Sequence, residues 1–217
     1  MNLTNILNSR YATKSFDPNK IIPDEILVQI KELLQLSPSS VNVQPWHFLL
    51  AISPEAKQKI INATAGGYSF NEEKIRNASH VIVMCGKREL PEDYLLHLLD
   101  IEEQEGRYLK SEFKEQNHMA RTFFVNLHKN EFQDLPHWIE KQVYLNMGAL
   151  LLGAAVLGVD ALPMEGIDFS ILNDEFGLDE KGLNAVTVVA LGYKTDDDFN
   201  SSLPKARLPL DEIVTEL

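Results

Sequence analysis

Two short segments of this sequence concentrate positive charge in a chain that is acidic overall. Arg10 and Lys14 lie in R-Y-A-T-K, just after the first apolar stretch, and Lys205 and Arg207 lie in K-A-R near the C-terminal end. Guanidinium and ammonium groups bind phosphate oxygens strongly, so these four cations would suit a phosphate monoester if folding brought them together. By spacing alone, the simpler interpretation is that all four are solvated surface charges.

Three other segments carry polar groups that suit a bound heteroaromatic ring. Residues 37–46 place closely spaced hydrogen-bonding side chains between two prolines, directly before an apolar stretch, and such groups match the edge of a ring. Asn71 and Lys74 lie three residues apart on an expected helical turn, and residues 163–166 are expected to form a turn. Each segment by itself is more simply explained as an ordinary polar loop or helix surface.

Several common kinds of active site are not supported. The glycine-rich fingerprints of dinucleotide and P-loop sites and the G-x-S-x-G elbow of hydrolases are absent from the sequence. The six histidines have no metal-ligand spacing, and Cys85 lies in an apolar stretch, where a small core residue is expected. The acidic stretch Asp100–Glu105 is interpreted as the solvated face of a helix. We therefore expect no metal site and no hydrolytic centre.

Length, composition and charge limit the protein class. The 217 residues correspond to one or two typical domains, and the apolar share of 44% is ordinary for a folded protein. With 20 basic and 32 acidic residues the formal net charge is −12, which disfavours binding to nucleic acid or to an anionic membrane. The single cysteine cannot form an intrachain disulfide, and no signal-peptide pattern begins the sequence. We expect a cytoplasmic protein.

Hydrophobic periodicity predicts long helices around a few strands. Apolar runs at 46–52, 80–85 and 185–191 predict buried strands. Helical spacing and capping residues predict helices at 2–10, 23–38, 54–65, 91–107, 111–130, 135–158 and 169–176. Three or four strands among these helices define an α+β fold class.

The longest predicted helix contains an uncharged run of 17 residues, Val143–Val159. A membrane span needs about 20 apolar residues, and an asparagine and three glycines interrupt this run. We favour a helix buried in the core or in a subunit interface, where Gly148 and Gly153 would let another helix approach closely.

Taken together and in order, these motifs resemble the nitroreductase family of FMN-dependent flavoenzymes. The resemblance runs from end to end and rests on R-Y-A-T-K-S-F-D, L-S-P-S-S-V-N-V-Q-P-W-H-F, F-N-E-E-K, K-Q-V-Y-L-N-M-G, P-M-E-G and L-P-K-A-R-L-P. Within the family, the sequence is most similar to the oxygen-insensitive NAD(P)H nitroreductase and dihydropteridine reductase branch. The resemblance implies one nitroreductase-like FMN-binding domain over residues 1–217, with a central mixed sheet flanked by helices. It also implies an intertwined homodimer with long central helices, in which both chains build each FMN site.

The resemblance further implies roles for individual residues. Those that would hold the FMN phosphate are Arg10, Lys205 and Arg207. Those near the pyrimidine edge of the flavin are Lys14, Asn71 and Lys74, and those supplied by the partner subunit are Pro38, Ser39, Ser40 and Asn42. Pro163, Glu165 and Gly166 would line the opposite side of the ring, with backbone N–H groups at the last two facing the flavin N5. Tyr11 and Ala12 complete the implied cofactor-binding set, and the implied substrate channel contains Tyr68, Phe70 and Phe124.

The sequence departs from close relatives in this family at a few of these positions. Ala12 stands where they have a serine, Tyr11 where a histidine is common, and Val41 where they have a threonine. A neutral hydrogen bond contributes about 1 kcal/mol, so Ala12 should weaken FMN binding modestly. The replacement of threonine by valine at position 41 is expected to alter substrate preference. Phe124 also allows a second interpretation, as an ordinary core residue of its helix.

The implied reaction is the reduction of nitroaromatics and quinones by NADH or NADPH, in two-electron steps with ping-pong kinetics. The flavin would carry the chemistry with electrostatic support from Lys14 and Lys74, so no catalytic side chain is expected. A dihydropteridine or free-flavin reductase remains an alternative within the enzyme class. A flavin-binding carrier without turnover is the alternative outside it.

Overall fold

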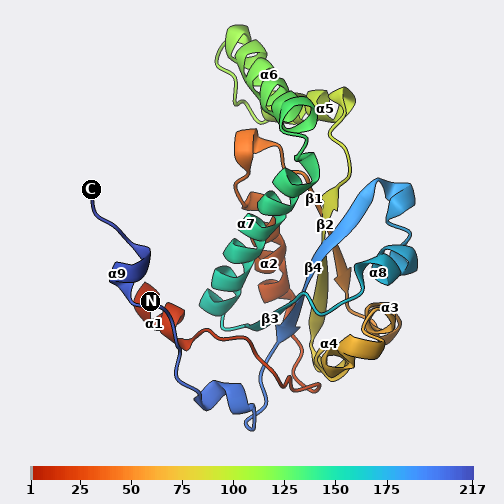
Figure 1. Ribbon diagram of the computed structural model, residues 1–217, viewed down its shortest axis with the longest axis vertical. Coiled ribbons are helices and arrows are strands. Elements are labelled where there is room, and N and C mark those ends of the chain that lie inside the picture. The colour runs from red at the N-terminus through yellow and green to blue at the C-terminus, as the bar shows by residue number, and fades with distance from the viewer. Residues whose placement is uncertain (1) are drawn as a thin grey trace.

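Four β-strands form one sheet at the centre of the molecule (Figure 1). The structure is a computed structural model that describes residues 2–217. The strands are β1 (Trp46–Ala51), β2 (His80–Lys87), β3 (Asp160–Met164) and β4 (Leu183–Gly192), in the order β1-β2-β4-β3. The expected α+β class is confirmed. The four strands pair antiparallel, so within residues 2–217 the expected mixed character is limited to a parallel bridge between Ala12 and Ala161.

Helices cover both faces of this sheet, and α5 and α6 project from one end of it (Figure 1). The helices are α1 (Leu3–Ser9), α2 (Asp24–Leu36), α3 (Pro54–Asn62), α4 (Glu72–Asn77), α5 (Glu92–Gln104), α6 (Ser111–Asn126), α7 (Leu135–Val156), α8 (Phe169–Phe176) and α9 (Leu210–Ile213). All the helices predicted from periodicity are confirmed, with ends that shift by a few residues. A π-helical turn, η3 (Leu127–Glu131), follows α6.

The alternation of side chains along β2 explains why helices cover both faces. Val81, Val83 and Cys85 join an apolar cluster with residues of α3, α4 and α8, whereas Ile82 and Met84 join a second cluster with α2 and α7. Successive side chains of a strand point to opposite faces, so an unbroken apolar run needs a layer on each side. The thiol of Cys85 is buried, and burial raises its pKa to about 12, as expected of a core residue.

Strand β3 is the one strand that the periodicity does not predict. The expected turn at residues 163–166 is wrong for Pro163 and Met164, which pair with Val189 and Val188 of β4. Proline lacks the N–H that a central strand needs, and β3 lies at the edge of the sheet, where that loss is tolerated. A strand of five residues with a proline offers too short a pattern for alternation to be recognised.

Helix α7 contains most of the uncharged run and packs against the sheet and α2. Val143, Leu150 and Ala154 are buried there, while Val156 is exposed. A Cβ atom at Gly153 would overlap the side chain of Leu33 in α2, so this glycine permits a close helix approach within the chain itself. Within residues 2–217, no helix is both long and apolar enough to cross a membrane.

Candidate functional site

The two basic segments of the sequence meet beside the N-terminal helix. The ammonium group of Lys205 donates hydrogen bonds to the backbone carbonyls of Leu7 and Arg10. The pKa of Lys205 is lowered by partial burial and by the positive charges of Arg10 and Arg207. Since like charges repel, three cations held this close together form a site that favours an anion.

A buried aspartate holds the first basic segment in place. The carboxylate of Asp198 accepts hydrogen bonds from the backbone N–H of Lys14, at 3.0 Å, and from the hydroxyl of Tyr11, at 3.2 Å. Burial and the Asp198 charge raise the pKa of Tyr11 to about 12. Asn200 donates to the carbonyl of Ala12 at 2.8 Å, so the backbone at Ala12 is fixed although its side chain offers no hydroxyl. Asp198 is not among the residues identified from the sequence, where its only signal is its place before the short helix η5 (Phe199–Ser202), which it caps.

A second group of the site residues expected from the sequence lies at the start of α4. The amide of Asn71 donates to the carbonyl of Gly166 at 3.0 Å, and Lys74 donates to the Asn71 side-chain oxygen at 3.2 Å. The ammonium nitrogen of Lys74 lies 4.9 Å from the centre of the Phe70 ring. Burial lowers the pKa of Lys74, and the positive charge of Lys14 lowers it further.

The side chains of Asn71, Phe70 and Tyr68 crowd closely around Gly166. A Cβ atom at this position would lie 2.8 Å from Nδ2 of Asn71, 3.2 Å from Cζ of Phe70 and 3.3 Å from Cδ1 of Tyr68. Any larger residue would therefore force these side chains to shift. The preceding residue, Glu165, accepts a hydrogen bond from the hydroxyl of Tyr144 at 2.5 Å, and burial together with Glu165 raises the pKa of Tyr144 to about 12.

The cations of both clusters, around Lys205 and around Lys74, lack acidic partners. Among the residues that the structure describes, no carboxylate forms an ion pair with Arg10, Lys14, Lys74, Lys205 or Arg207. The formal net charge of the chain is −12, so acidic side chains are abundant. Unpaired cations in two clusters, joined by the short segment 10–14, fit a ligand with a phosphate at one end and, at the other, a ring with hydrogen-bond acceptors along its edge.

The loop before β1 has a strained backbone. Val41, Asn42 and Gln44 have φ angles of 45°, 52° and 43°, in the left-handed region. This conformation costs about 1–3 kcal/mol for a β-branched residue such as Val41, so the surroundings must stabilise it. Ser39 Oγ accepts from the backbone N–H of Gln44 at 2.9 Å, and the N–H of Ser40 donates to Gln142 Oε1 in α7 at 2.9 Å.

A buried ion pair lies behind this loop. Arg121 of α6 is fully buried and donates to Oε1 of Glu102 in α5 at 2.6 Å. Asn42 donates to the same oxygen, also at 2.6 Å. Burial alone would raise the pKa of Glu102, but hydrogen bonds from Arg121, Tyr108 and Asn42 outweigh it, and the pKa is lowered. The interpretation of Asp100–Glu105 as a solvated face is therefore wrong for Glu102, and Arg121 is missed altogether.

The chain does not bring this loop to the other predicted residues. Trp46, just after the loop, pairs with Gly86, whereas α4 lies beside His80 at the other end of β2 (Figure 1). Six residues of strand separate these points by about 20 Å. Helix α6, which carries Phe124, lies at the same end as the loop (Figure 1). The Phe124 side chain is 39% exposed, which excludes the core interpretation. Pro38 lies in a groove between α2 and α7. The loop and Phe124 thus lie apart from Tyr68, Phe70 and the cations.

Comparison with known proteins gives one consistent result. The model of the nitroreductase family matches residues 7–193. The chain is 46% identical to the oxygen-insensitive NAD(P)H nitroreductase of Enterobacter cloacae, over 100% of both chains, and 34% identical to the major NAD(P)H-flavin oxidoreductase of Aliivibrio fischeri, over 97% and 96%. A candidate nitroreductase of Exiguobacterium sibiricum, solved in complex with FMN, superposes with a TM-score of 0.84 at 26% identity, covering 100% of this chain and 98% of that one.

Proposed function

The chain belongs to the nitroreductase family, and from this premise we propose that it is an FMN-dependent oxidoreductase that uses NADH or NADPH to reduce nitroaromatics and quinones. The observation that carries the proposal is the pair of cation clusters without acidic partners, one around Lys205 and one around Lys74. One FMN-binding domain over residues 1–217 accounts for the full-length similarity to the relatives. The lone, buried Cys85 fits the reducing environment of the cytoplasm.

The residues present fit FMN at both of its ends. Arg10, Lys205 and Arg207 would hold the phosphate, because guanidinium and ammonium groups supply several charge-assisted donors to its oxygens. Lys14, Lys74 and Asn71 would lie at the pyrimidine edge of the ring. Pro163, Glu165 and Gly166 would line the ring, and the bare backbone at 166 lets Asn71 approach closely and donate to its carbonyl. Tyr11 and Ala12 would complete the site through the segment that Asp198 holds.

The chain's own contribution to the reaction is electrostatic. Bound FMN would supply the redox chemistry, taking a hydride from the nicotinamide and passing two electrons to the acceptor. Lys14 and Lys74 would stabilise the negative charge that reduction places on the pyrimidine edge, which favours two-electron over one-electron transfer. The residues Tyr68, Phe70 and Phe124 would receive both donor and acceptor on the same face, so one must leave before the other enters. This order gives ping-pong kinetics.

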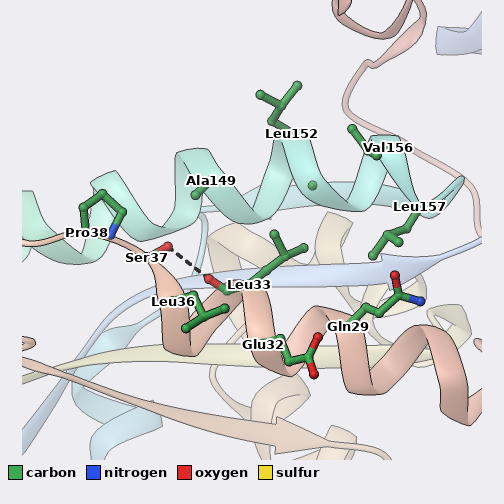
Figure 2. A pocket seen from close by; sticks show the side chains of 11 residues that line it. Gln29, Glu32, Leu33, Leu36, Ser37, Pro38, Ala149, Leu152, Val156 and Leu157 are labelled. Carbon is green, nitrogen blue, oxygen red and sulfur yellow. Dashed lines mark hydrogen bonds between the residues drawn. The ribbon is translucent and has the colours of Figure 1, made fainter. Parts of the chain in front are cut away.

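Two copies of the chain would build each site. The residues at one end of the sheet, Ser39, Ser40, Asn42 and Phe124, would meet the cations at the other end only across a subunit interface. Figure 2 shows the groove that would form part of this interface, lined mainly by apolar side chains of α2 and α7, with a volume of about 550 Å³. Leu36 at its rim is 77% exposed, and a second copy would remove such apolar surface from water.

A second candidate is a reductase of free flavin, which the 34% identity to an NAD(P)H-flavin oxidoreductase favours, or a reductase of a pterin. Steady-state assays with each acceptor and with NADH or NADPH rank the candidates by kcat/KM. Oxygen uptake tests the two-electron mechanism, because one-electron reduction of a nitroaromatic gives a radical anion that oxygen reoxidises. We expect nitroaromatic reduction in air without oxygen uptake. Oxygen consumption in proportion to NAD(P)H oxidation would contradict two-electron transfer, and absence of turnover with every acceptor would favour a carrier.

A further inference from the structure

We propose that the Glu102–Arg121 pair is a positioning unit that fixes the Val41–Asn42 turn relative to helix α6 and thereby sets which acceptors the site takes. This inference rests on the proposed function, in which the loop before β1 and Phe124 of one chain face the flavin held by the other. Neither residue of the pair touches the flavin in that arrangement. Both act through their neighbours.

Each member of the pair holds one residue of the strained turn. Arg121 Nε donates to the carbonyl of Val41 at 3.0 Å, and Glu102 Oε1 accepts from the side chain of Asn42 at 2.6 Å. Because Val41 has a φ angle of 45°, the turn relaxes toward ordinary backbone angles if these bonds are lost. The side chain of Asn42 is directed by Glu102 rather than left free to rotate.

The same carboxylate joins the two projecting helices. Glu102 Oε2 accepts from the hydroxyl of Tyr108, which lies between α5 and α6, and from Asn117 of α6 at 3.0 Å. Arg121 lies one helical turn after Asn117 and three residues before Phe124, so all three move with α6. One buried carboxylate therefore connects α5, α6 and the turn.

This connection fixes the separation between Phe124 and the Val41–Asn42 turn. Under the proposed function, these two elements bound the space above the partner's flavin, and an acceptor must fit between them. A shift of α6 against the turn changes that space, and acceptors of different size respond unequally because small misplacements alter reaction rates strongly. The pair thus acts on selectivity, and through Asn42 also on the partner's flavin, whereas the cations that would bind the flavin lie at the other end of the sheet.

The test compares two acceptors in Glu102→Gln and Arg121→Lys. The first substitution keeps the size of Glu102 and removes its charge; the second keeps the charge of Arg121 and removes the Nε donor to Val41. The measured quantity is the ratio of kcat/KM for a naphthoquinone to that for a benzoquinone, with NADH as donor. This ratio is independent of the concentration of active enzyme, so partial unfolding or partial loss of flavin does not move it. We expect a change of about fivefold or more in both variants.

Glu103→Gln is the matched control, because Glu103 neighbours Glu102 on α5 but is exposed and pairs with Lys114. Its ratio should equal that of the wild type. If the two buried variants fail to fold, Tyr108→Phe removes only the hydroxyl that donates to Glu102 and accepts from Asn117, and a shifted ratio is still expected. An unchanged ratio in every folded variant overturns the inference while leaving the proposed function intact. Absence of acceptor reduction by the wild type would instead refute the proposed function.

Discussion

Replacing Arg10 by glutamine should weaken the binding of FMN without weakening the binding of riboflavin. Arg10 lies with Lys205 and Arg207 in a cluster of cations without acidic partners, and a hydrogen bond to a charged group contributes about 1.5–3 kcal/mol. Because the cluster is open to solvent, salt and water screen it, and the lower half of that range applies. A loss of about 1.5–2 kcal/mol corresponds to a dissociation constant roughly 10–30-fold higher.

The assay is a titration of apoprotein, following the quenching of flavin fluorescence, with FMN and riboflavin in parallel. Riboflavin carries the same ring but no phosphate, so its affinity reports the ring site alone. Arg88→Gln serves as control, because Arg88 already pairs with Asp179 outside the site and its loss should leave both affinities unchanged. Equal weakening of FMN and riboflavin in Arg10→Gln would indicate general damage to the fold. An unchanged FMN affinity would refute the proposal that Arg10, Lys205 and Arg207 hold the FMN phosphate.

Further predictions concern the buried ion pair and the groove. Arg121→Met should lower the free energy of unfolding by about 3–5 kcal/mol, because it leaves the buried Glu102 charge without its cation. A loss below about 1 kcal/mol in urea denaturation would contradict this expectation. The folded-state pKa of Glu102 is lowered below its ordinary value of 4.5, so the ionised carboxylate stabilises the fold at pH values above 4.5. The difference in free energy of unfolding between the wild type and Glu102→Gln should therefore shrink as the pH falls below 4.5. Leu152→Glu, in the groove, should prevent the proposed dimer and give a monomer in sedimentation, whereas Leu109→Glu, at an exposed position outside the groove, should leave the dimer intact; a stable Leu152→Glu dimer would place the interface elsewhere.

The central strands and the long helices could be predicted because their signals are local. The apolar runs of β2 and β4 are long enough to require burial on both faces, and Ser53 and Pro54 define the start of α3 directly. Strand β3 carries no such signal. Its pairing depends on β4, more than twenty residues later, and on an edge position that tolerates Pro163.

The candidate site was only partly predictable, because its spatial arrangement depends on contacts distant in sequence. Local motifs identify the two basic segments, but their meeting depends on Lys205 reaching the carbonyls of Leu7 and Arg10. Glu102 looks like its exposed acidic neighbours, and only the distant Arg121 and Asn42 reveal its burial. Asp198 is likewise identified by its partners alone. The tertiary fold decides whether a charged residue is buried. The acidic composition around Glu102 instead suggests that it is exposed to solvent.

The most direct test of the account is the visible absorption spectrum of the freshly purified protein, followed by anaerobic addition of NADPH and then of a quinone. The account predicts a yellow protein with a flavin spectrum that bleaches with NADPH and recovers fully with the quinone. A yellow protein that neither reductant nor quinone affects would be a flavin carrier. A colourless protein that added FMN cannot reconstitute would contradict the account, because the cations around Arg10 and Lys74 would then hold no flavin.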